Sequence, residues 1–124
     1  MANIERIKSL QNTLRKAKER GDYLDLTTWG WGTTHCIAGW LTTDPLFLKA
    51  GGTTIEDNHG LAIPAFSDYE DYDAVSEYLD IDDDQANLLC NAALSKSYYG
   101  KNYKDVTFND AIQKLQNIID EARS

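Results

Sequence analysis

Apolar residues recur at intervals of three and four near both ends of the chain, a spacing that is typical of amphipathic helices. The first stripe ends at Gly21, and Lys and Arg fill its last turns. The second stripe follows Thr107, which forms with Asp110 the sequence pattern of a capping box. The first stripe consists of Ile4, Ile7, Leu10, Leu14 and Ala17. The second, the clearest in the chain, consists of Phe108, Ala111, Ile112, Leu115, Ile118, Ile119 and Ala122.

Shorter helices are predicted between these two. Thr33 or Thr34 can cap a helix that runs to about Leu41. The Asp44-Pro45 dipeptide has the form of an N-cap followed by proline in the first turn, and it predicts a helix that ends at Gly51-Gly52. Two further helices are predicted over residues 73–79 and about 83–94, and loops over residues 22–32, 67–73 and 95–106.

The hydrophobic period changes over residues 53–63, where Thr54-Ile-Glu and Leu61-Ala-Ile flank Asp57-Asn-His-Gly. This pattern predicts a small β-hairpin with a four-residue loop, closed by Pro64. The length of 124 residues suits one domain, and the chain contains no internal repeat or long linker. We therefore expect a mainly α, compact single-domain helical fold over residues 1–124, with one small hairpin at about residues 53–63.

Charge is distributed unevenly along the chain, whose formal net charge is −8. Residues 1–20 hold six Lys or Arg against two Glu, whereas residues 56–84 hold eleven Asp or Glu and no Lys or Arg. Such a surface repels phosphate backbones, which argues against nucleic-acid and anionic-membrane binding. It suits a basic partner, or a protein that competes with DNA for one. The same surface also serves to keep a protein soluble, and the sequence leaves both interpretations open.

Several classes of protein are disfavoured by what the chain lacks. No apolar run is long enough for a transmembrane helix, and the N-terminal segment has no apolar core of a secretory signal. Cys36 and Cys90 both stand in apolar helical surroundings, which predicts buried free thiols in a reducing compartment. The sequence also allows a disulfide bond between the two cysteines. We therefore expect a soluble cytoplasmic protein without a membrane partner.

Cys36 is the strongest candidate for a catalytic nucleophile, although the sequence assigns no catalytic residue. It lies near the predicted start of a helix, where unpaired N–H groups and the helix dipole favour a thiolate. His59 on the hairpin loop could act as its base, oriented by Asp57 or Asn58, which would give a thiol-dependent acyl transfer or hydrolysis. The competing interpretation places Cys36 in the core beside Trp40.

No metal site or cofactor is predicted. The chain contains only four soft ligands, two Cys and two His, and none of their spacings matches a zinc motif. The Asp-rich segment 80–84 resembles the opening of a calcium loop, but Gln85 stands where the glycine belongs and Asn91 where the bidentate glutamate belongs. Helix capping explains these aspartates better.

Aromatic residues outside the helical stripes form a second candidate site. Tyr and Trp present large amphipathic areas at low entropic cost and are typical of interface anchors, although they are typical of cores as well. The candidate binding residues are Trp29, Trp31, His35, Tyr98, Tyr99 and Tyr103.

The stretch Trp29-Gly-Trp-Gly-Thr-Thr-His-Cys-Ile-Ala-Gly-Trp resembles the W-x-C-G-T-x-x-C-x-A-G-W signature of a family of small uncharacterised bacterial and phage proteins. A second segment over residues 74–90 and the closing amphipathic helix are also similar, so the resemblance covers most of the chain. Trp31 replaces the first Cys of the signature, which argues against a paired-cysteine redox or metal role. The family implies no activity; it implies the context of a phage accessory protein in the host cytoplasm.

Three functions follow from these patterns. The first is a small acidic non-catalytic interaction protein that binds or inhibits a host protein. Self-association into a homo-oligomer is compatible with this function. The second is the thiol enzyme that uses Cys36 and His59. The third is a protein that sequesters a small ligand, which ranks below the others because few basic residues lie outside the first helix.

Overall fold

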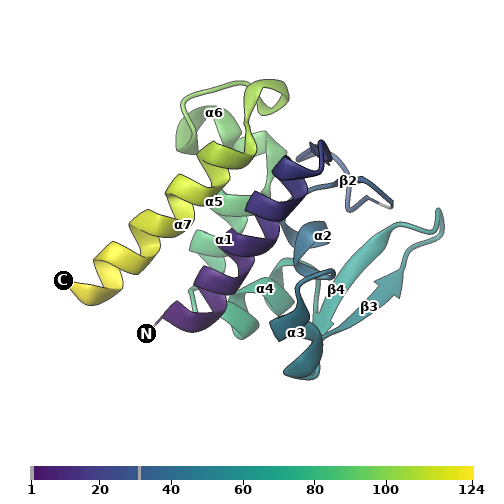
Figure 1. Ribbon diagram of the computed structural model, residues 1–124. Helices are drawn as coiled ribbons and strands as arrows, with labels where there is room; N and C mark the ends of the chain where they lie inside the picture. The colour runs from purple at the N-terminus through teal and green to yellow at the C-terminus, as the bar shows by residue number, and fades with distance from the viewer. Residues whose placement is uncertain (1, 31) are drawn as a thin grey trace.

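The computed structural model describes residues 2–30 and 32–124, and it confirms a compact, mainly α fold with a small antiparallel sheet (Figure 1). The two longest helices, α1 (Ile4–Glu19) and α7 (Phe108–Arg123), pack against each other although they come from opposite ends of the chain. No helix in the described ranges is long and apolar enough to span a membrane.

Both long helices follow the pattern in the sequence. Asn3 caps α1 by accepting a hydrogen bond from the Arg6 N–H, and Gly21, with a φ of +80°, follows its end. The capping box of α7 is confirmed, because the Thr107 side chain bonds the Asp110 N–H and the Asp110 carboxylate bonds the Thr107 N–H. Gln11 is buried between the helices and donates from Nε2 to the Ile112 carbonyl at 3.0 Å.

The shorter helices predicted from the sequence are present, but they begin or end at other residues than predicted. The helix predicted over 83–94 ends at Cys90, because Asn91 is extended and its side chain caps a new 3-10 turn. The predicted loop over 95–106 contains a further helical turn and a 3-10 turn. These elements are α2 (Ile37–Leu41), α3 (Pro45–Lys49), α4 (Asp71–Leu79), α5 (Asp83–Cys90), η1 (Ala92–Leu94), α6 (Ser95–Tyr98) and η2 (Tyr103–Asp105).

The start of α2 is later than the sequence predicts. Neither Thr33 nor Thr34 caps it; Cys36 is the N-cap, and its Sγ accepts a hydrogen bond from the Gly39 N–H at 3.4 Å. The residues before it form strand β2 (Thr34–His35), which pairs in parallel with β1 (Tyr23–Leu24). The cap of α3 is as predicted, since Asp44 Oδ1 accepts from the first N–H groups of that helix.

The hairpin is present and larger than expected. Strands β3 (Thr53–Glu56) and β4 (Ala62–Phe66) pair antiparallel, and β5 (Tyr69–Glu70) adds a third strand within the segment predicted as loop. Pro64 lies inside β4 opposite Thr54 rather than closing the hairpin. The Ala62 N–H donates to the Gly30 carbonyl at 2.9 Å, which ties this sheet to the loop before β2.

The core lies between α1, α2, α4, α5 and α7. Trp40 is buried near its centre, and its Nε1 donates to the Tyr23 carbonyl at 3.1 Å. Tyr78 packs edge-on against Phe47, and the Arg6 guanidinium lies 4.6 Å from the centre of the Tyr78 ring. The largest fully buried side chains are Trp40, Tyr78, Phe47, Ile7, Leu10, Leu14, Ile37, Leu41, Leu79, Leu89, Leu115 and Ile119.

Replacing Gly39 with alanine is expected to destabilise the protein, although the same change in an exposed helix adds about 0.5–1 kcal/mol of stability. A Cβ at position 39 would lie 1.8 Å from the Trp29 carbonyl oxygen, a backbone atom that cannot move aside cheaply. We expect a loss of about 1–3 kcal/mol in the free energy of unfolding, measured by urea denaturation. Lys8→Ala on the exposed side of α1 is the control and should change stability by less than about 0.5 kcal/mol. A more stable Gly39→Ala protein would contradict the close approach.

Candidate functional site

His35 belongs to the interior, which corrects its assignment to an exposed recognition surface. Its side chain is only 4% exposed, and its ring packs edge-on against Trp40 with 4.6 Å between centres. Its Nδ1 lies 3.0 Å from the Trp29 carbonyl and its Nε2 lies 3.1 Å from the Gly32 carbonyl. His35 therefore holds the loop before β2 in shape and does not reach a partner.

Cys36 is buried at the start of α2, with 2% of its surface exposed. Burial raises the pKa of its thiol to about 11, although the N–H groups of Gly39 and Ala38 act to lower it. A depression of about 80 Å³ lies beside it and is lined in part by Trp29 and Tyr72. The helix N-terminus does point at the sulfur, as the sequence predicts, but loss of solvent outweighs it and keeps the thiol protonated.

The structure does not bring His59 to Cys36. His59 lies exposed in the loop between β3 and β4, and its N–H donates to Asp57 Oδ1 at 2.8 Å. This end of the hairpin projects from the body of the protein, whereas α2 lies inside it (Figure 1). Asp57 orders the loop, because it also accepts from the Leu61 N–H at 2.9 Å, and it does not orient an imidazole toward a thiol.

The second thiol is also enclosed. Cys90 is completely buried, and both cysteines are free. Burial, and next the nearby Cys36, raise the pKa of the Cys90 thiol well above its ordinary value. Within residues 2–30 and 32–124, no group of three or more His, Cys, Asp or Glu side chains is placed to hold a metal ion.

The tyrosines after α5 are half-buried and hydrogen-bonded inside the protein. The Tyr99 hydroxyl donates to the Leu89 carbonyl, and the Tyr98 hydroxyl accepts from Gln85 Nε2, both at 2.7 Å. Their rings pack edge-on with 5.1 Å between centres. Tyr103 instead lines a groove of about 490 Å³ together with Tyr23.

Of the two tryptophans predicted for the recognition surface, the structure describes only Trp29. Trp29 packs its ring against Tyr72 with 5.3 Å between centres. Trp31 lies outside the described residues. The side chains of four further candidates are half-buried, so each keeps part of its surface exposed, and their role in recognition stays a prediction: Trp29, Tyr98, Tyr99 and Tyr103.

Two exposed aromatic residues were not predicted as site residues. Tyr23 is 64% exposed and Tyr69 is 45% exposed. Tyr69 lies in β5, between Asp68 and Glu70 in the acidic segment. The mixture of carboxylates and tyrosines over residues 68–73 is the signal in the sequence for such a surface, although the same composition is also typical of a loop.

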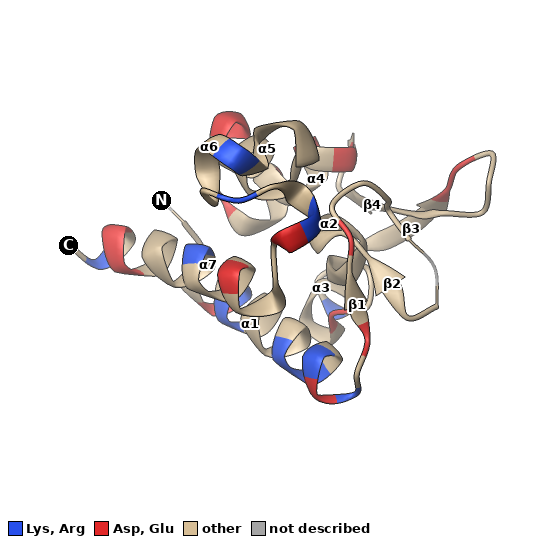
Figure 2. Cartoon of the chain, turned by 90° about the horizontal axis from the view of Figure 1, so that it is seen from above, with Lys and Arg blue, Asp and Glu red and all other residues tan. Residues whose placement is uncertain are grey.

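Most of the carboxylates of residues 56–84 face solvent. Ten of the eleven are exposed, and Asp57 is half-buried. In Figure 2 the acidic positions of α4, α5 and the hairpin loop lie away from α1, along which Lys and Arg gather. Neighbouring acidic groups also affect one another. Partial burial raises the pKa of Asp71, and the nearby Asp73 and Glu70 raise it further, whereas a hydrogen bond from the Tyr72 N–H acts to lower it. We call the exposed carboxylates of residues 56–84 the acidic face.

Comparison of the chain with models of known protein families, with curated proteins and with solved structures gives no match. The resemblance of the Trp29–Trp40 stretch to small bacterial and phage proteins is therefore untested and stays a prediction.

We expect slow alkylation of Cys36 in a Cys90→Ser variant. With a pKa of about 11, only about one thiol in a thousand is ionised at pH 8, against about one in four for a free thiol. The rate with iodoacetamide should therefore be at least about 100-fold lower in the native protein than in urea, and it should rise steadily above pH 9. Circular dichroism at each pH controls for unfolding. Fast native labelling with a midpoint below about pH 8.5 would contradict the enclosed thiol and revive the enzyme hypothesis.

Proposed function

We propose that this protein is a non-catalytic interaction module whose acidic face binds a basic segment of a partner protein. The observation that carries the proposal is the exposure of ten carboxylates in a segment without Lys or Arg. Like charges held together on a folded surface repel one another, and a cationic partner relieves that repulsion. Complementary charge of this kind also speeds encounter and excludes partners of the wrong sign.

The ion pairs recorded between described residues lie outside the acidic face. Among the described residues, Arg20 pairs with Asp22 and Lys101 pairs with Asp110, both at 2.9 Å and both outside residues 56–84. Asp80 has an interaction of its own and is not counted in this argument. The other carboxylates of the acidic face stay available to cationic groups of a partner.

Tyr69 gives the acidic face an aromatic contact. Its half-exposed ring stands between Asp68 and Glu70 and opposite Phe66 in the sheet. Tyrosines in such positions anchor protein interfaces, because they present a large area and lose little conformational entropy. A basic segment that lies along β5 would meet this ring and, from the neighbouring positions of the chain, the exposed carboxylates of Asp68 and Glu70. In this proposal the partner is a protein of the host cell, following the resemblance to phage proteins.

The thiol enzyme is the weaker alternative. Cys36 is enclosed and protonated, and the hairpin holds His59 away from it. A nucleophile and its base need to lie within hydrogen-bond reach or move there. The interaction function needs no such movement.

We expect reversal of charge on the acidic face to weaken binding of a basic peptide. The test variant combines Asp68→Lys, Asp73→Lys and Glu77→Lys, three exposed residues that cap no helix. Affinity for a fluorescent lysine-rich peptide, measured by anisotropy at low salt, should fall at least about tenfold. The salt dependence of binding should also become shallower.

The matched control combines Glu19→Lys, Asp105→Lys and Glu121→Lys, which changes the net charge equally at exposed positions outside the acidic face. It should retain affinity within about threefold. Equal losses in both variants would show an effect of net charge alone and would contradict a docking surface. Binding that is indifferent to salt would contradict its electrostatic basis. Light scattering of the unmodified protein shows whether a second copy, through its basic α1, occupies the same face.

A further inference from the structure

A groove separates α1 from α3 on the basic side of the protein. Its volume is about 540 Å³, which is in the range of small-ligand sites. The residues that line it and carry hydrogen-bonding or charged groups include Asn12, Thr13, Lys16, Arg20, Thr43 and Lys49. We call this feature the α1–α3 groove.

Asp44 fixes the two walls of the groove relative to each other. It is fully buried, and its Oδ1 accepts from the Ser9 hydroxyl of α1 at 2.7 Å. The same oxygen accepts from the Leu46 N–H at 2.9 Å, in the first turn of α3. One carboxylate oxygen therefore joins both helices, and the groove is built into the fold rather than formed by mobile side chains.

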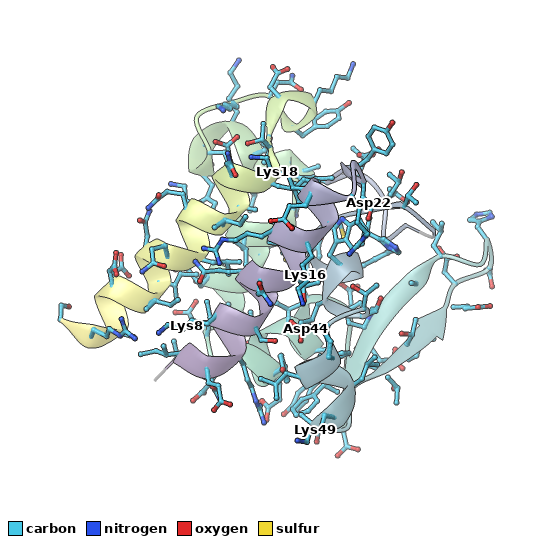
Figure 3. The ribbon with its side chains drawn as sticks, in the orientation of Figure 1. Lys8, Lys16, Lys18, Asp22, Asp44 and Lys49 are labelled. Atoms are coloured by element: carbon cyan, nitrogen blue, oxygen red, sulfur yellow. The ribbon has the colours of Figure 1, made fainter. Side chains whose placement is uncertain are left out.

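The groove gathers positive charge in a protein that is otherwise acidic. Lys16 and Arg20 come from the last turns of α1, and Lys49 from the last turn of α3. Figure 3 shows Lys16 on α1, Lys49 on α3 and Asp44 between the two helices. No carboxylate is among the lining residues, and the net charge of the chain is −8.

The three cations differ in how they are held. Arg20 is positioned, because its Nε donates to Asp22 at 2.9 Å and its guanidinium lies 5.9 Å from the centre of the Trp40 ring. Its terminal N–H groups remain available, and a guanidinium presents them in the geometry that suits phosphate oxygens. Lys16 and Lys49 are exposed and make no ion pair with any described residue. They supply mobile point charges.

We infer that the α1–α3 groove binds a compact ligand that carries at least two phosphate charges. Three cations around a concave site match such a ligand, and the Asn12 amide and Thr13 hydroxyl can bond a polar body between its charges. The described lining residues include no aromatic ring, which argues against a ligand that is held by stacking. This site goes beyond the proposed binding of a basic protein, because it lies on α1 and α3 and takes the opposite charge.

Inorganic pyrophosphate is the probe for this site, with binding measured by calorimetry and by amide chemical shifts. The test variant is Lys16→Gln with Lys49→Gln, which leaves Arg20 and its packing intact. The control is Lys8→Gln with Lys18→Gln, which removes the same charge from α1 positions outside the groove lining (Figure 3). We expect the test variant to bind pyrophosphate at least about tenfold more weakly, and the control to stay within about twofold.

Each outcome of this experiment decides the inference. Shift changes in α1 and α3 that vanish only in the test variant support it. Absence of pyrophosphate binding, or equal loss in both variants, overturns it. Citrate binding as tightly as pyrophosphate overturns the preference for phosphate. Urea midpoints should be equal for the variants, because neither Lys16 nor Lys49 packs in the core. The lysine-rich peptide should bind the test variant normally, so failure here and failure of the acidic face are distinguishable.

Discussion

The close approach of the Trp29 backbone to α2 over Gly39 is the constraint on which the rest of the structure depends. A side chain at position 39 would overlap the Trp29 carbonyl, and one at Gly30 would overlap Thr34 and His35. These two glycines let the loop pack closely against α2, and the buried His35 ring contacts the Trp29 carbonyl of that loop through Nδ1. Helix α2 in turn contacts α1, α4, α5 and β4. Thr28 and Trp29 of the same loop line the depression beside Cys36.

Loss of solvent decides what the thiols can do. At the start of α2, N–H groups lower the pKa of Cys36, and burial raises it by more. The acidic face is the opposite case, because its carboxylates are exposed to water. The two thiols are therefore inside the protein, while the acidic positions of α4, α5 and the hairpin loop lie at the surface, away from the Lys and Arg of α1. The proposed interaction function rests on this arrangement.

Local chemistry explains what the sequence could predict. The Thr107–Asp110 box, the Asp44-Pro45 start of α3 and the end of α1 before Gly21 each depend on a few neighbouring residues. The rest depends on distant partners. Helix α2 begins only at Ile37, after the N-cap Cys36, because Thr34 and His35 pair with β1. His35 is buried because two glycines make room for it. The α1–α3 groove was missed because Lys49 joins Lys16 and Arg20 only in the folded chain.

The hydrogen bond from Gln11 to the Ile112 carbonyl spans 101 residues of sequence. Helices α1 and α7 bury their apolar faces against each other, so the apolar face of α1 is covered only when α7 is in place. Closing such a long segment of chain is slow, because its entropy is lost before the contact is gained. Until α7 is in place, α1 therefore has an uncovered apolar side opposite its basic residues.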